Sequence, residues 1–335
     1  MASESLTIFG DYLLLERVGM GGMAEVFRAQ RRTRRPGESD LALKRLLPNI
    51  AEDPTLSRLY LREVEALRRI DHPVVVRMVD AGELHGLPYV VMPWLGGHSL
   101  RQIMSMGEGV PQRPLPVAVA LWLAAELADG LHAAHQMGVV HRDVSPSNVL
   151  ITDAGDVRLI DFGIARVAGL AQTTHGQSWR GKWAYATPEQ IAGQPVDART
   201  DVFALASVTV ECLLGQAPFA DTDRQSTLAR IQVAEPARWP QNLDREVDEL
   251  LRQMVQHDPT GRPPDAAAVA ARLRQWLSAQ PVDPAMPQWC TQQLRGRVLA
   301  VPRPASRAAI TSAELRGEDV TKPEQDRDAT EVRIT

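Results

Sequence analysis

The stretch from His141 to Gly163 constrains the fold of this chain more than any other part of its sequence. It begins with His-Arg-Asp and ends with Asp-Phe-Gly. Between these ends, residues 149–151 and 157–160 are short runs rich in β-branched residues, and a turn that contains Gly155 separates them. This pattern predicts a β-hairpin, with Asp143 shortly before its first strand and Asp161 directly after its second strand.

The predicted hairpin would bring Asp143, Asn148 and Asp161 around one pocket. Asp143 offers a carboxylate that can accept a proton from a hydroxyl group, and Asn148 and Asp161 offer hard oxygen ligands for a cation. Phosphoryl transfer with bound Mg²⁺ requires these kinds of group close together. The three residues therefore favour an enzyme that transfers a phosphoryl group.

The order and spacing of these residues resemble the catalytic loop and the Asp-Phe-Gly segment of protein kinases. The chain is similar to bacterial Hanks-type serine/threonine protein kinases, with a catalytic-loop variant that reads Asp-Val-Ser-Pro. The resemblance implies an α+β, bilobal protein-kinase fold, with a five-stranded antiparallel N-lobe, one regulatory helix and a mainly helical C-lobe. It also implies transfer of the γ-phosphate of ATP to serine and threonine hydroxyls of proteins, with Mg²⁺ as the metal and Mn²⁺ as its alternative.

The resemblance covers residues 12–278, the expected kinase domain. Its expected parts are an N-lobe at about 12–92, a hinge at 93–97 and a C-lobe at 98–278, after an N-terminal extension at 1–11. The strands expected in the N-lobe are 12–16, 25–29, 41–44, 74–79 and 87–92. From residue 279 to 335 the composition changes to Pro, Arg, Thr and mixed charge without a helical or strand period, so a largely disordered tail is expected. Trp289 leaves open that residues near 280–296 pack on the domain.

A glycine-rich turn lies between the first two expected strands. Its glycines at 19, 21 and 22 lack a Cβ, so the backbone can approach phosphate oxygens. By resemblance, Pro93 and Leu95 in the hinge would bind adenine through backbone groups, and Val26, Ala42 and Leu150 would enclose its ring or else be plain core residues. The full set implied to bind ATP is Val18, Gly19, Met20, Gly21, Gly22, Met23, Ala24, Glu25, Val26, Ala42, Lys44, Pro93, Leu95 and Leu150.

Lys44 ends the apolar strand expected at 41–44. A lysine in this place can be an edge residue with its charge in solvent, but it resembles the lysine that pairs with the α- and β-phosphates of ATP. An amphipathic pattern from residue 54 to 70 predicts a helix that carries two candidate partners for this lysine, Glu63 and Glu65. Glu63 is preferred, because its nine-residue separation from His72 matches the family. The pair would hold Lys44 in register.

The catalytic loop departs from the family pattern at one position, and the activation segment at another. Ser145 stands two residues after Asp143, where relatives usually carry a lysine that neutralises the transferring γ-phosphate. Lys182 follows Gly181, where relatives usually read Gly-Thr. We expect Lys182 to supply the missing catalytic charge near Asp143, with the alternative that it docks the substrate or is solvated.

The segment from residue 161 to 189 is polar and contains three hydroxyl residues that are candidates for autophosphorylation: Thr173, Thr174 and Ser178. Arg142 resembles the arginine that receives such a phosphate through charge-assisted hydrogen bonds. Regulation by phosphorylation of this segment is therefore expected.

Three further residues are expected to hold the C-lobe together. Ala-Thr-Pro-Glu at 186–189 resembles the Ala-Pro-Glu motif, whose glutamate, Glu189, should form an ion pair with Arg262. Asp201, at the start of an apolar helix expected at 202–214, should cap the backbone of the catalytic loop.

The net charge of −4 gives no indication of a nucleic-acid or membrane partner. Two cysteines fit a reducing compartment, and no run of about 18 uncharged apolar residues predicts a membrane span. The longest apolar stretch, residues 117–134, is interrupted by Glu126 and Asp129. We therefore expect a cytoplasmic enzyme with protein substrates, and the sequence carries no signal for its oligomeric state.

Two alternatives remain beside a protein kinase. Small-molecule phosphotransferases share the fold, but they lack the Pro-Glu end of the activation segment with its paired arginine. Two departures from the family pattern suggest a pseudokinase that binds nucleotide or protein without transfer. Ser145 replaces the catalytic-loop lysine, and Ala24 stands where the family has the third glycine of its glycine-rich turn. The intact set of Lys44, Asp143, Asn148 and Asp161 argues for an enzyme.

Overall fold

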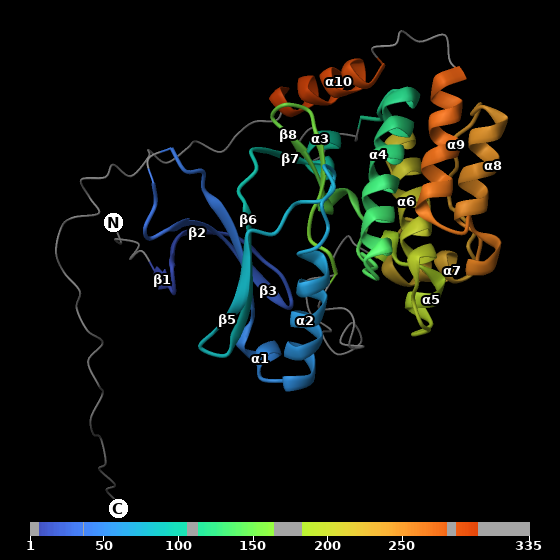
Figure 1. Ribbon diagram of the computed structural model, residues 1–335. Coiled ribbons are helices and arrows are strands. Elements are labelled where there is room, and N and C mark those ends of the chain that lie inside the picture. Colours follow the sequence, from blue (N-terminus) through green and yellow to red (C-terminus); the bar gives the residue numbers. More distant parts are fainter. Residues whose placement is uncertain (1–6, 36, 106–112, 164–182, 280–285, 301–335) are drawn as a thin grey trace, which may run out of the picture. The chain divides into compact units, whose positions relative to one another are not determined.

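Six antiparallel strands form the sheet of the N-lobe, in the order β1-β2-β3-β4-β6-β5 (Figure 1). Their bounds are β1 Thr7–Phe9, β2 Tyr12–Met20, β3 Ala24–Arg31, β4 Leu41–Leu46, β5 Asp80–Leu84 and β6 Leu87–Pro93. This computed structural model describes residues 7–35, 37–105, 113–163, 183–279 and 286–300. All of them belong to one structural unit, which ends at Val301.

The sheet confirms the predicted antiparallel N-lobe and corrects it in two places. β1 is an additional strand, inside the expected N-terminal extension. The strand predicted at residues 74–79 is wrong, because this described segment forms an isolated bridge between Val75 and Leu159 instead. Val74 packs against helix α4 (Val117–Gln136), where a Cβ added to Gly130 would lie 2.8 Å from its side chain. Val74 and Val75 therefore connect this segment of the N-lobe to α4 and β9 (Val157–Leu159).

Helix α2 (Pro54–Leu67) is the predicted helix of the N-lobe, and the short α1 (Pro48–Ala51) precedes it. The Asp53 carboxylate caps α2 by accepting hydrogen bonds from the N–H groups of Thr55 and Leu56 at 2.8 and 3.3 Å. Tyr60 and Val64 are buried on the core side of α2. The helix is thus fixed at its start and along one face.

A smaller sheet connects the lobes in the order β7-β8-β9. Its strands are β7 Gly97–Ser99, β8 Val149–Thr152 and β9 Val157–Leu159, so the predicted hairpin is confirmed. Gly97 has a φ of +142°, and a Cβ there would lie 2.2 Å from the carbonyl oxygen of Ile151. Glycine therefore allows β7 to approach β8.

The C-lobe is mainly helical, as predicted (Figure 1). Besides α4 it contains α3 Leu100–Met104, α5 Pro188–Ile191, α6 Ala198–Leu214, α7 Arg224–Gln232, α8 Arg245–Met254 and α9 Ala266–Ala279. Among the described residues, α4 is long and apolar enough to cross a membrane by length and composition alone. Most of α4 is buried, however, and it packs against α6 and α9. These contacts are those of a core helix.

Helix α10 (Met286–Ala300) corrects part of the prediction for the tail. Two of its side chains, Leu294 and Val298, are fully buried in the main hydrophobic core. Residues 301–335 lie outside the described part of the chain. Packing of residues near 280–296 on the domain, which the sequence left open, is therefore confirmed at Leu294, and it extends to Val298.

Candidate active site

The β8–β9 hairpin brings together the residues predicted to carry the chemistry. The N–H group of Ile160 donates to the carbonyl of Asn148 at 2.9 Å, which closes the end of the hairpin beside Asp161. The Asn148 side-chain nitrogen donates to the carbonyl of Asp143 at 2.7 Å. The amide of Asn148 thus joins the catalytic loop to this end of the hairpin.

Asp201 holds the backbone of the catalytic loop, as predicted. Its buried carboxylate accepts hydrogen bonds from the N–H groups of His141 at 2.7 Å and Arg142 at 2.8 Å. The side chain of His135 lies 2.8 Å from the same carboxylate. Helix α6 has a different N-cap, Asp197, so Asp201 serves the catalytic loop and not the start of its own helix.

Arg142 and Asp161 have backbones in the left-handed region, with φ of +63° and +57°. Residues other than glycine rarely adopt this conformation, which costs about 1–3 kcal/mol and requires support from neighbouring contacts. The carbonyl of Arg142 accepts a hydrogen bond from the Gln190 side-chain nitrogen at 2.9 Å, and its guanidinium contacts Glu63. The peptide immediately before Asp143 is therefore held by several elements. The sequence reasoning missed Gln190, which has no motif of its own.

His141 supports the catalytic loop and is fully buried. The Asp143 N–H group donates to His141 Nδ1 at 3.2 Å, and His141 Nε2 lies 3.1 Å from the carbonyl of Ile160. Burial lowers the pKa of His141, so its ring is neutral near pH 7 and Nε2 carries the proton donated to Ile160. The ring also packs on Phe162, with 4.4 Å between ring centres.

The predicted ion pair between Lys44 and Glu63 is wrong for this structure. Lys44 Nζ lies 3.1 Å from Asp161 Oδ1, whereas Glu63 Oε1 lies 2.6 Å from Arg142 Nη1. Several partly buried charges meet here, and the planar guanidinium of Arg142 is a better partner for a half-buried carboxylate than an ammonium group. Glu63 consequently connects α2 to the catalytic loop.

Burial raises the pKa of Glu63 to about 7, although Arg142 acts in the opposite direction. The folded state therefore binds a proton at Glu63 that the unfolded chain has released above about pH 4.5. The contribution of Glu63 to stability is fully present below that unfolded pKa and is lost as the pH rises through about 7.

We expect Glu63→Gln to flatten the decrease in melting temperature between pH 5 and pH 8. Because Glu63 is partly exposed, solvent screening reduces its contribution to stability to about 1 kcal/mol. The decrease in melting temperature from pH 5 to pH 8 should therefore be about 2–4 °C smaller in the variant than in wild type. Differential scanning fluorimetry across this range measures it. Glu65→Gln is the control, because Glu65 is exposed on the same helix. Equal pH profiles for the two variants would show that Glu63 does not titrate in this range.

The glycine-rich turn connects β2 to β3, and the Gly21 N–H group donates to the carbonyl of Ala24 at 2.8 Å. Val18 and Met20 are exposed, Ala24 is buried in the core, and Met23 packs against that core. Glu25 is also buried, and its carboxylate pairs with Arg45 at 2.7 Å and with Arg17 at 3.7 Å. Its side chain thus serves the sheet, although its backbone borders the turn.

The residues predicted to surround adenine come from both sheets and from the segment after β6. Val26 pairs with Lys44 between β3 and β4, and Ala42 pairs with Met92 between β4 and β6. Pro93 ends β6, Leu95 follows it, and Leu150 lies on β8; all three are half-buried. This arrangement is consistent with either predicted role, an adenine pocket or ordinary packing.

The residues predicted to hold Mg²⁺ fit that ion by their chemistry. Asn148 uses its side-chain nitrogen toward Asp143, so its amide oxygen is the atom suited to a cation. Asp161 adds a carboxylate, one oxygen of which contacts Lys44. Mg²⁺ usually takes one or two protein ligands together with substrate phosphates and waters. Asn148 and Asp161 would be its two protein ligands. In the described residues no group of three His, Cys, Asp or Glu side chains could hold a metal.

A buried network that the sequence reasoning missed holds the activation segment close to its C-terminal end. Arg101 Nη1 contacts Glu211 Oε1 at 2.9 Å, and the Tyr185 hydroxyl lies between the side chains of Arg101 and Glu211. Burial raises the pKa of Glu211, which Arg101 counteracts. One signal was present in the sequence: Glu211 interrupts an apolar helix, and a buried carboxylate requires partners.

A cation–π contact fixes the same turn from the other side. Arg224 Cζ lies 3.7 Å from the centre of the Trp183 ring. The short 3-10 turn Trp183–Tyr185 is therefore attached to α7 through Trp183 and to α3 and α6 through Tyr185. This turn lies within the activation segment, shortly before Glu189.

Glu189 and Arg262 form the predicted ion pair, which is confirmed. Arg262 Nη1 and Nη2 bind the two carboxylate oxygens of Glu189 at 2.8 and 2.9 Å, and both side chains are buried. The Thr200 hydroxyl donates to the same carboxylate at 2.8 Å. Burial raises the pKa of Glu189, but the hydrogen bonds from Arg262 outweigh it and the net pKa is lowered.

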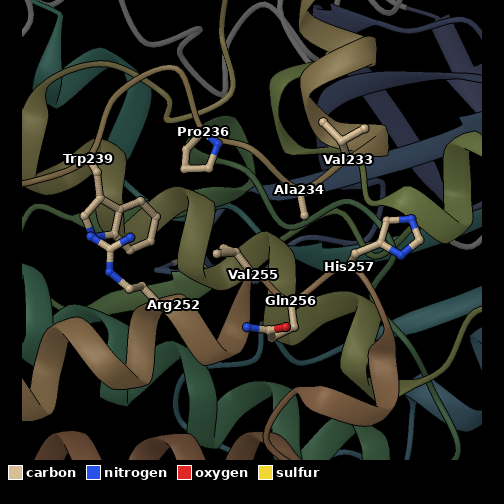
Figure 2. Close-up of a pocket in the computed structure, with 8 residues that line it drawn as sticks. All are labelled: Val233, Ala234, Pro236, Trp239, Arg252, Val255, Gln256 and His257. Atoms are coloured by element: carbon tan, nitrogen blue, oxygen red, sulfur yellow. The ribbon is translucent and has the colours of Figure 1, made fainter.

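Four residues singled out in the sequence, Thr173, Thr174, Ser178 and Lys182, lie outside the described residues. A cavity of about 300 Å³ lies between the end of α7 and the end of α8 (Figure 2). Its lining residues are Val233, Ala234, Pro236, Trp239, Arg252, Val255, Gln256 and His257. None of these belongs to the predicted site, so the cavity is separate from the candidate active site.

Comparison with known proteins gives a clear family. The protein kinase domain matches residues 12–276. A tyrosine-protein kinase MasK of Myxococcus xanthus is 31% identical over 281 residues, which is 81% of this chain and 43% of the relative. The serine/threonine-protein kinase PknB of Mycolicibacterium smegmatis is 34% identical over 318 residues, 91% of this chain and 48% of the relative. This chain thus spans less than half the length of these curated relatives.

Solved structures show the same fold. The kinase domain of Mycobacterium tuberculosis PknI superposes with a TM-score of 0.60 at 28% sequence identity. The match covers 82% of this chain and 99% of that domain. The chain therefore belongs to the protein kinase family.

Proposed function

We propose that this chain transfers the γ-phosphate of ATP to serine and threonine hydroxyls of proteins. The observation that carries the proposal is the convergence of Asp143, Asn148 and Asp161 at one end of the hairpin, with Lys44 at 3.1 Å from Asp161. Kinase relatives at 31–34% identity support it. The site would work in the cytoplasm on protein substrates.

The roles follow from the chemistry of each side chain. Asp143 orients the acceptor hydroxyl and accepts its proton, while Lys44 moves from Asp161 to the nucleotide phosphates. Asn148 and Asp161 would hold the metal. Bound Mg²⁺, or Mn²⁺ in its place, neutralises charge on the β- and γ-phosphates.

Serine and threonine are the proposed acceptors, although one relative is named a tyrosine kinase. The region around Pro146 lacks the Ala-Ala-Arg pattern of tyrosine kinases, and PknB is named a serine/threonine kinase. Mass spectrometry of a protein substrate offered with all three hydroxyl residues tests the assignment. Phosphate on serine and threonine supports it, and phosphate confined to tyrosine would contradict it.

We also propose that the activation segment is regulated by autophosphorylation at Thr173, Thr174 or Ser178. A phosphate there would compete with Glu63 for the guanidinium of Arg142, which now lies 2.6 Å from Glu63. Release of Glu63 would allow the pair with Lys44 that the resemblance implies. Phosphate mapping of active protein, with the triple alanine variant as comparison, tests this regulation.

Lys182 is proposed to replace the missing charge of the catalytic loop. Ser145 is buried, and among the described residues its hydroxyl finds no hydrogen-bond partner, so it offers no charge to a γ-phosphate. The chain contains three lysines, Lys44, Lys182 and Lys322, so few ammonium groups are available.

Lys182→Met should lower kcat by about one to three orders of magnitude with little change in ATP affinity, because the charge acts mainly in the transition state. Adding Ser145→Lys should restore part of the loss. Steady-state kinetics measure both effects, with Lys322→Met as the control. A change confined to the KM of the protein substrate would make Lys182 a docking residue.

A further inference from the structure

Helix α10 lies on the turn of the β8–β9 hairpin (Figure 1). Gly155 in that turn has a φ of +92°, and a Cβ added there would lie 2.3 Å from the carbonyl oxygen of Thr291. The backbone of α10 therefore touches the backbone of the turn. The family match ends at residue 276, so this contact comes from outside the matched domain.

The attachment of α10 has an apolar part and a polar part. Leu294 and Val298, one helical turn apart, are fully buried in the main core. Arg297 donates to the carbonyls of Arg113 and Pro114 at 3.1 and 2.7 Å, just before α4. Burial lowers the pKa of Arg297, because the charged guanidinium loses part of its contact with water. The helix is thus tied both to the hairpin and to the start of α4.

The hairpin is short enough to transmit this constraint. At the turn, the Thr152 N–H group donates to the carbonyl of Asp156 at 2.9 Å, and the Gly155 N–H group donates to the carbonyl of Thr152 at 2.8 Å. At the other end, Ile160 and Asn148 are joined at 2.9 Å. A four-residue strand such as β8 is about 13 Å long at about 3.3 Å per residue. A movement of the turn around Gly155 should therefore also move Asn148 and Asp161, the candidate metal ligands at the opposite end of the hairpin.

We propose that α10 is a positioning element of the active site. By holding the turn, Thr291, Leu294, Arg297 and Val298 fix the hairpin and so the relative placement of Asn148 and Asp161 for a metal–nucleotide ligand. This inference rests on the proposed function. Residues that orient metal ligands without touching the metal commonly change metal affinity by about 10- to 100-fold when they are lost.

The test uses the full chain with the double change Leu294→Asp and Val298→Asp, and Gln293→Asp as the control because Gln293 is exposed on the same helix. Hydrogen–deuterium exchange of the hairpin amides should be about 10-fold faster in the double variant. The Mg²⁺ concentration for half-maximal phosphate transfer should rise about 10-fold. The KM of the protein substrate should stay within about 2-fold, because α10 contacts the hairpin turn and the residues before α4 and not Asp143, which is assigned to the acceptor hydroxyl.

Gly296→Ala provides a second variant that should fold. Its Cβ would meet no atom within 4 Å, and alanine favours the helix more than glycine does. Exchange in both α10 and the hairpin should then be slower than in wild type. Two results would overturn the proposal. In the first, the amides of α10 exchange freely in the double variant, but hairpin exchange and Mg²⁺ dependence stay at wild-type values. In the second, the amides of α10 exchange more slowly in Gly296→Ala, again with hairpin exchange and Mg²⁺ dependence at wild-type values. Absence of transfer in wild type would contradict the proposed function instead, and the exchange result would still decide the role of α10.

Discussion

Asp143→Asn should abolish phosphate transfer while leaving the binding of Mg²⁺-ATP within about 2-fold of wild type. The carboxylate of Asp143 is assigned to the acceptor hydroxyl, and loss of a general base typically costs about 10²- to 10⁴-fold in rate. The nucleotide contacts are assigned elsewhere, to the glycine-rich turn, the hinge and Lys44. Asparagine keeps the shape of the side chain, and the backbone bonds of Asp143 to His141 and Asn148 do not involve its carboxylate.

Two measurements separate these effects. Isothermal titration calorimetry gives nucleotide affinity, and single-turnover transfer from labelled ATP gives the rate. Asp71→Asn is the control, since Asp71 is an exposed aspartate after α2. Transfer by Asp143→Asn at the rate of Asp71→Asn would mean that another group accepts the proton.

Arg262→Ala should destabilise the protein by about 3–5 kcal/mol, because it leaves the carboxylate of Glu189 buried without its partner. Arg262 also donates to the carbonyls of Gln256, Arg199 and His257, which would lose those bonds. At about 2–4 °C per kcal/mol for a domain of this size, the melting temperature should fall by about 6–20 °C.

The matched control for Arg262→Ala is Arg245→Ala. Arg245 forms an exposed pair with Glu249 at 2.7 Å, and exposed pairs of this kind contribute little to stability. Thermal unfolding of both variants measures the difference. Melting temperatures that agree within the error of the measurement would show that the buried pair does not stabilise the C-lobe.

The sequence predicted the β8–β9 hairpin from its own residues, because two runs rich in β-branched residues flank a turn. The bonds from Asp201 to the catalytic loop and the pair between Glu189 and Arg262 join residues far apart in the chain, and they were expected from the resemblance to protein kinases. In both of these cases a buried charged group requires a partner, and the family motifs supply both members of the contact.

The partners of Lys44 and Glu63 could not be predicted in the same way. Two acidic and two basic side chains meet between the lobes, and their pairing depends on distances that no local pattern sets. The family resemblance implies a phosphate of the activation segment as the partner of Arg142, and no local pattern indicates that its guanidinium contacts Glu63. The outcome, Lys44 with Asp161 and Glu63 with Arg142, required the structure.

Hydrophobic pattern alone also misassigned two segments. Val74 and Val75 are buried in the main core, and Val74 packs against α4. The short apolar run that contains them fits a strand equally well by its hydrophobic pattern. In α10 the apolar signal is weak, since Leu294 and Val298 provide most of the burial among its described side chains. Packing against the hairpin and the start of α4 stabilises this helix, and its own sequence gave no period that indicated it.

The most direct test of the proposed function is the fate of the γ-phosphate of ATP. The purified chain is incubated with Mg²⁺, γ-labelled ATP and a generic protein substrate, and the label is followed to its acceptor. We predict that the label moves to serine and threonine side chains of the substrate and of the chain itself. Tight nucleotide binding with all of the label retained in ATP would contradict a catalytic role and establish a pseudokinase.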